Sequence, residues 1–102
     1  MINYKKLSIC ADDFGITNKV SDAIINLVSL KRITETSCMV LPNSFQNKAK
    51  TLMYYKNTIN IGLHLTLTDF KPLSKSGSLS NNQKMPSINK LIIKCLLKNI
   101  SK

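Results

Sequence analysis

The chain has 102 residues, which allows one small domain, and its 43% hydrophobic content with three Gly and three Pro excludes a disordered chain. Its net charge of +10 comes almost wholly from Lys, with Arg32 as the single arginine. Nucleic-acid-binding proteins usually concentrate Arg and aromatic side chains on one face, so the scattered lysines argue against a nucleic-acid partner.

The cysteines and the apolar runs predict the cellular compartment of the protein. Cys10, Cys38 and Cys95 form no C-x-x-C pair, and no secretion signal precedes them. This pattern predicts reduced thiols in the cytoplasm, and the apolar runs around Cys10 and Cys38 favour buried structural thiols. No run approaches the ~20 apolar residues of a membrane span, so we expect a cytoplasmic protein without a membrane partner.

The first predicted strand, residues 7–11, is an apolar run that ends on two adjacent carboxylates, Asp12 and Asp13. Gly15 then lets the backbone turn. Ligands bind at this end of parallel strands, and neighbouring carboxylates repel each other unless a cation or a shared proton relieves them. The pattern therefore favours a metal site, with a simple Asx turn before the next helix as the alternative.

Two helices and a second strand follow in alternation. Thr17 is the predicted N-cap of a helix over residues 18–31, where apolar residues recur every three or four positions. Residues 34–41 are rich in β-branched and apolar residues, which predicts a strand. Ser44 is expected to cap a second helix that runs to residue 56.

Residues 59–68 alternate between apolar and polar side chains, which predicts a third strand with His64 on its polar face. A lone histidine in a strand is more often a hydrogen-bonded core residue than a ligand. Alternation of strands and helices with short connections predicts a parallel α/β sheet, so the first and third strands would present polar groups at the same end.

The remaining chain is a long connection and a helix. Residues 70–86 are mostly polar and contain Pro72 and Pro86 near their two ends. A connection of this length is typical of a binding loop or a mobile segment. Residues 87–100 are predicted to form a basic amphipathic helix capped by Ser87. Such a helix can lie on a membrane surface, but in a chain of this size its apolar face more often packs on a sheet.

Few side chains can carry chemistry, because the chain has five acidic residues and one histidine. The candidates are Asp12, Asp13, His64 and Asp69. Three of these candidates fall in two motifs, Ala11-Asp-Asp-Phe-Gly-Ile-Thr17 and Asn60-Ile-Gly-Leu-His-Leu-Thr-Leu-Thr68. In order and approximate spacing, these motifs resemble those of the YdjC-like carbohydrate deacetylases. The resemblance covers roughly residues 5–75.

This resemblance implies an α/β fold of parallel β/α units, the first part of a distorted (β/α) barrel of the polysaccharide-deacetylase type. It also implies metal-dependent hydrolysis of N-acetyl groups from amino sugars or oligosaccharides. Matched to the motifs, Asp12 would be the general base, and Asp13 and His64 would be metal ligands. Magnesium, manganese and zinc all suit such an oxygen and nitrogen ligand set.

The resemblance further implies a second metal histidine downstream, whereas this sequence holds a single histidine. Barrels of eight β/α units need about 250 residues. We therefore expect residues 1–102 to be the N-terminal portion of a longer deacetylase domain, with an incomplete metal site. The alternative is a small non-enzymatic α/β module, or inactive remnant, that self-associates as a homodimer through a free sheet edge and the basic helix.

Overall fold

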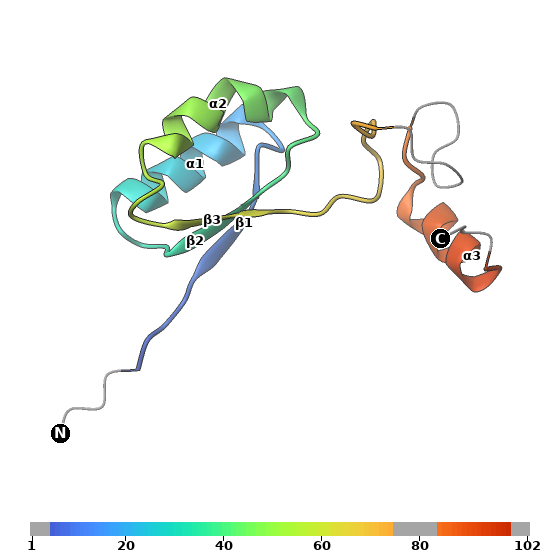
Figure 1. The fold of residues 1–102 in the computed structure, drawn as a ribbon, viewed down its shortest axis with the longest axis horizontal. Coiled ribbons are helices and arrows are strands. Elements are labelled where there is room, and N and C mark those ends of the chain that lie inside the picture. The colour runs from blue at the N-terminus through green and yellow to red at the C-terminus, as the bar shows by residue number, and fades with distance from the viewer. Residues whose placement is uncertain (1–4, 75–83, 99–102) are drawn as a thin grey trace. The chain divides into compact units, whose positions relative to one another are not determined.

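A computed structural model of the chain describes residues 5–74 and 84–98 (Figure 1). The chain divides into two compact units, Met1–His64 and Leu65–Lys102. The first unit holds five elements, which are β1 (Cys10–Phe14), α1 (Asn18–Ser29), β2 (Glu35–Cys38), α2 (Asn43–Met53) and β3 (Asn60–Leu63). The second holds α3 (Ile88–Leu96).

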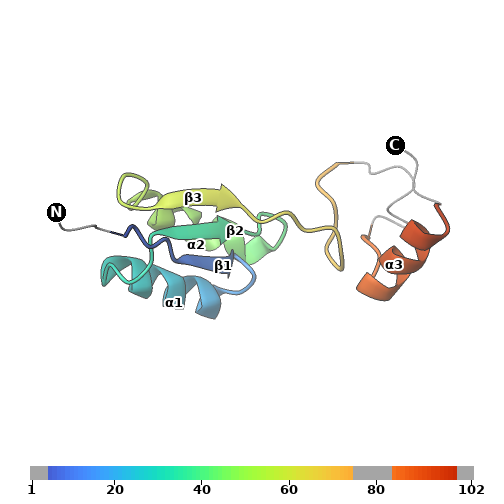
Figure 2. The ribbon, with the colours of Figure 1, turned by 90° about the horizontal axis from the view of Figure 1, so that it is seen from below.

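The first unit is a parallel sheet covered on one face. Its three strands lie in the order β1-β2-β3 with parallel pairing throughout, which confirms the predicted parallel α/β sheet. Both helices lie on the same side of the sheet, and the arrows of the strands point the same way (Figures 1 and 2). Barrels place their helices on one side, whereas doubly wound sheets use both faces. Closure into a barrel stays a prediction, since the described strands form an open sheet.

The start of the first strand was predicted too early. β1 begins at Cys10, and the preceding apolar side chains Leu7 and Ile9 are 76% and 45% exposed. The Ile9 carbonyl accepts hydrogen bonds from the N–H groups of Thr34 and Glu35, so this segment runs beside the start of β2. The covering helices bury the later part of the strand instead, where Phe14 is fully buried.

The third strand was predicted too long. β3 ends at Leu63, and the prediction that it continues to Thr68 was wrong. A strand needs a partner, and β2 ends at Cys38, whose carbonyl accepts the His64 N–H at 2.9 Å. His64 is therefore the last residue held beside β2.

The helices follow the sequence pattern with shorter ends. α1 ends at Ser29, and Thr17 caps it as predicted, with the Val20 N–H donating to the Thr17 hydroxyl at 3.1 Å. α2 begins at Asn43 after Pro42, and its N-terminus has no side-chain cap. The prediction that Ser44 caps α2 was therefore wrong, because its hydroxyl donates to the Gly15 carbonyl instead.

Thr17→Ala is expected to lower the free energy of unfolding by about 0.5–2 kcal/mol, since the change leaves an N–H group at the start of α1 without its side-chain acceptor. Ser87→Ala is the matched control, because Ser87 occupies the N-cap position of α3 without a side-chain capping bond. Urea denaturation followed by circular dichroism compares the two. Equal losses for both variants would contradict the capping role of Thr17.

The core lies between the helices and the covered face of the sheet. Its buried members come from both layers: Phe14, Ile24, Val28, Ile33, Cys38, Leu52 and Ile59. Phe14 also meets Phe45 of α2 edge to face, with ring centroids 6.4 Å apart. Cys38 is buried as predicted, whereas Cys10 is exposed, which corrects the expectation of a buried thiol there. Cys10 lies on the opposite, open face of the sheet.

Strand β3 lies at an edge of the described sheet. Ile61 and Leu63 pair in register with the buried residues Thr36 and Cys38, and therefore share their face, yet they are 37% and 67% exposed. These two apolar side chains are therefore only partly covered. Self-association through such an edge stays a prediction.

The second unit was predicted as a loop and a helix. Residues 75–83 of the expected loop and residues 99–100 of the expected helix lie outside the described residues. Phe70 and Met85, on either side of that gap, are joined by a hydrogen bond of 2.9 Å from the Met85 N–H to the Phe70 carbonyl. α3 begins at Ile88 as predicted, but it ends at Leu96 and Ser87 makes no side-chain capping bond, so the predicted cap was wrong. None of its side chains is buried. In the described residues, no helix has the length and apolar content needed to cross a membrane.

Candidate active site

The site begins with an irregularity in β1. Ala11 pairs with Thr36 and Phe14 with Cys38, so three steps along β1 match two steps along β2. The extra residue is a β-bulge, which falls at Asp12 and Asp13. Bulges of this kind re-aim side chains and are frequent beside active sites.

The bulge changes the direction of one carboxylate. In a regular strand, Asp13 would share the face of Ala11, under the helices, where an unpaired carboxylate is costly. Asp13 instead has a left-handed φ of 68°, a conformation that Asp tolerates better than most residues. Its side chain is 48% exposed, on the same side as Asp12 and His64. The irregular backbone thus places two adjacent carboxylates together.

A tight turn after the bulge fixes this arrangement. Gly15 has a φ of 97°, and a Cβ there would lie 2.5 Å from the Met39 carbonyl oxygen and 2.9 Å from Phe45 Cβ. The Gly15 N–H donates to the buried Ser21 hydroxyl at 3.0 Å, and its carbonyl accepts from Ser44. Both polar groups of Gly15 are therefore tied to the helices, which confirms the predicted turn.

The side chains of three strands meet at the carboxyl end of the sheet. Asp13 Oδ1 lies 3.3 Å from His64 Nδ1, and the His64 side chain is 32% exposed. The Ser37 hydroxyl donates to Asp12 Oδ1 at 2.6 Å and lies 3.1 Å from the same His64 Nδ1. Asp12, Asp13 and His64, three of the four candidates from the sequence, therefore do come together.

The electrostatics of the site keep Asp12 charged. The hydrogen bond from the Ser37 hydroxyl is the main influence that lowers the pKa of Asp12 below 3.8, with smaller contributions from Cys10 and His64. Partial desolvation, followed by the negative charge of Asp12, raises the pKa of the Cys10 thiol above 9.0, so the thiol stays protonated and donates to Asp12 at 3.7 Å. Asp12 is consequently an exposed carboxylate that is ionised at neutral pH, and a general base must be in its unprotonated form.

The sequence and the structure disagree on whether Asp69 and Ser37 belong to the site. Asp69 belongs to the second unit, where its N–H donates to the Pro86 carbonyl, and its candidacy rests on the sequence alone. Ser37 was not selected, although it contacts both Asp12 and His64. The only sequence signal was a polar residue in the second strand, and its partners depend on the register of Ser37 with Gly62.

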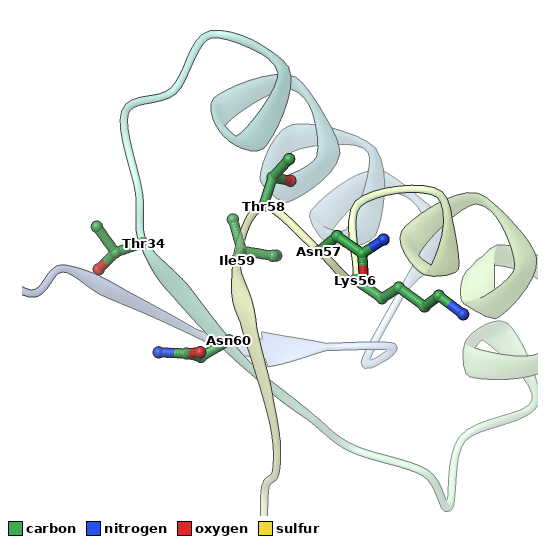
Figure 3. A pocket seen from close by; sticks show the side chains of 6 residues that line it. All are labelled: Thr34, Lys56, Asn57, Thr58, Ile59 and Asn60. Atoms are coloured by element: carbon green, nitrogen blue, oxygen red, sulfur yellow. The ribbon is translucent and has the colours of Figure 1, made fainter.

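A separate pocket lies at the opposite end of the strands. It has a volume of about 280 Å³ and is lined by Thr34, Lys56, Asn57, Thr58, Ile59 and Asn60 (Figure 3). Thr34 precedes β2 and Asn60 begins β3, so this pocket is at the amino ends, whereas Asp13 and His64 are at the carboxyl ends. It is therefore distinct from the candidate active site.

The donor set suits a divalent cation. A carboxylate and an imidazole, both partly exposed, lie side by side in Asp13 and His64. Oxygen and nitrogen donors of this kind bind zinc, and magnesium takes one or two carboxylates together with waters. In the described residues, no third His, Cys, Asp or Glu joins them in a group that could hold a metal ion. The described residues thus fit two positions of a cation's coordination sphere.

The fold and site define a class of protein. The family model for the YdjC-like protein matches residues 6–95, and the chain belongs to this family. Carbohydrate deacetylase 2 of Listeria innocua is 42% identical over 76 residues, which cover 74% of this chain and 30% of the relative. A carbohydrate deacetylase of Enterococcus faecalis is 37% identical over 86 residues, which cover 82% of this chain and 30% of the relative.

A solved structure has the same fold. It is the crystal structure of an Enterococcus faecalis protein described as a cellobiose-phosphate cleavage protein, with a TM-score of 0.77 and 30% sequence identity. The match covers 90% of this chain and 38% of that structure. The chain therefore spans about a third of the length of each relative that it matches.

Proposed function

We propose that this chain forms the N-terminal part of the active site of a metal-dependent carbohydrate deacetylase, which removes acetyl groups from N-acetylated amino sugars or oligosaccharides. The observation that supports it best is the convergence of Asp12, Asp13 and His64 at the carboxyl ends of parallel strands. The names of the two curated relatives support the substrate class. In this proposal the sheet is the first part of a distorted barrel.

Each residue has one role in the reaction. Asp12 accepts a proton from the water that attacks the acetamide carbon, since it is ionised and open to solvent. Asp13 and His64 would hold magnesium, manganese or zinc, and such a cation supplies Lewis acidity toward the acetamide carbonyl. The proton taken by Asp12 balances the reaction when it passes to the leaving amine, which gives acetate and a free amino sugar.

Acetate release from N-acetylated chito-oligosaccharide tests this proposal. Because the match covers 30% of the Listeria innocua deacetylase, the chain is joined in place of the matching part of that relative. We expect acetate release that stops when a chelator removes the metal and returns when zinc or magnesium is added. A chimera that is folded by circular dichroism yet releases no acetate would contradict the proposal.

A further inference from the structure

Hydroxyl groups from three other elements bind the backbone on either side of the bulge in β1. Before the bulge, the Thr36 hydroxyl of β2 donates to the Ala11 carbonyl at 2.7 Å. After the bulge, the Gly15 N–H donates to the Ser21 hydroxyl of α1 at 3.0 Å. The Gly15 carbonyl accepts from the Ser44 hydroxyl of α2. The bulged residues therefore lie between two points of the chain that are tied to the rest of the unit.

We propose that Thr36, Ser21 and Ser44 are positioning residues for the candidate active site. By fixing the backbone before and after the bulge, their hydroxyl groups keep Asp12 and Asp13 together on one face of the sheet. Their bearing on metal binding and catalysis rests on the proposed function. Their effect on the backbone of Asp13 does not depend on it.

The burial of these hydroxyl groups supports the proposal. In the part of the chain that the structure describes, the buried polar side chains are those of Thr36 and Ser21, which are 1% and 0% exposed. A buried hydroxyl is costly unless it is hydrogen-bonded, and a valine or an alanine would fill much of the same space without that cost. Both buried hydroxyls bind the backbone beside the bulge, so the polar groups inside the core are concentrated at this one feature.

Ser21 is oriented by a second hydrogen bond. Its hydroxyl donates to the Thr17 carbonyl, at the start of α1, at 2.9 Å. Because a hydroxyl has one proton to donate, its oxygen presents a lone pair to the Gly15 N–H. An N–H without an acceptor in the core would cost free energy, so the presence of Ser21 favours the turn at Gly15.

Two substitutions at Thr36 separate positioning from packing. Thr36→Val keeps the branched shape of the side chain and removes the hydroxyl, whereas Thr36→Ser keeps the hydroxyl and removes a buried methyl group. The readout is the ¹³Cα and ¹³Cβ chemical shifts of Asp13, which report its left-handed φ of 68°. We expect wild-type shifts in Thr36→Ser and shifts displaced toward those of an extended residue in Thr36→Val. A folded Thr36→Val with wild-type Asp13 shifts overturns the inference.

A second variant and a control complete this experiment. Ser44→Ala removes a half-buried hydroxyl, so it should displace the Asp13 shifts in the same direction. It decides the question if Thr36→Val does not fold, since wild-type Asp13 shifts in Ser44→Ala would equally overturn the inference. Ser29→Ala removes a hydroxyl that donates to the Asn26 carbonyl on α1, and it should leave the Asp13 shifts unchanged.

Zinc affinity, measured by calorimetry on the same variants, connects the backbone to the site. It should fall about tenfold in Thr36→Val and stay within about twofold of the wild type in Thr36→Ser. An equal loss of affinity in both variants would show that Thr36 only fills the core, and would overturn the inference. A wild-type chain that binds no zinc would count against the proposed function, and the Asp13 shifts would still decide the positioning role.

Discussion

Gly15→Ala is expected to lower the free energy of unfolding by about 2–5 kcal/mol, a large fraction of the stability of a small domain. Two costs combine at this position. The φ of 97° is one that residues with a Cβ rarely adopt, and the added Cβ would lie 2.5 Å from the Met39 carbonyl oxygen. That oxygen belongs to the backbone, so it cannot move aside as a flexible side chain could.

Gly62→Ala provides the matched control. A Cβ at Gly62 meets only the Thr36 carbonyl oxygen at 3.9 Å, an ordinary contact, and Gly62 has no left-handed φ. Its free energy of unfolding should change by less than about 1 kcal/mol. Urea denaturation of both variants measures the difference. If Gly15→Ala is as stable as Gly62→Ala, the tight turn does not hold the bulge in the way described.

Asp12→Asn is expected to reduce acetate release by the chimera about 10²–10⁴-fold, the usual contribution of a general base. The amide keeps an oxygen that accepts from the Ser37 hydroxyl, so the shape of the site is preserved while the basic group is lost. Since the pKa of Asp12 lies below 3.8, the wild-type base stays ionised from neutral to mildly acidic pH.

Asp22→Asn is the control for this change. Asp22 lies on α1 and pairs with Lys48 Nζ at 2.6 Å, a partly exposed ion pair that involves none of the site residues. Its loss should cost less than about 1 kcal/mol of stability and leave acetate release unchanged. Acetate release by Asp12→Asn within threefold of the wild type would exclude Asp12 as the base.

The sequence allowed the order of elements and the site residues to be predicted, because both depend on local patterns. Alternating polarity, the Thr17 cap and Gly15 each act within a few residues. Strand ends were less accurate, since they depend on partners far along the chain: β3 ends at Leu63 because β2 ends at Cys38.

The details of the site could not be read from the sequence. Adjacent residues in a regular strand face opposite sides, so a strand pattern does not predict that Asp12 and Asp13 share one face of the sheet. The bulge that brings them together depends on pairing with β2. The role of Ser37 depends on the same register, and the exposure of Cys10 depends on which face of the sheet the helices cover.

Zinc titration of the chain by calorimetry tests most directly whether Asp13 and His64 together hold a cation. We predict one binding site in the wild type, with affinity reduced at least about tenfold in both His64→Ala and Asp13→Asn. Asn tolerates the left-handed backbone of Asp13, so that variant removes the charge and keeps the fold. Equal affinity of the wild type and both variants would contradict the account.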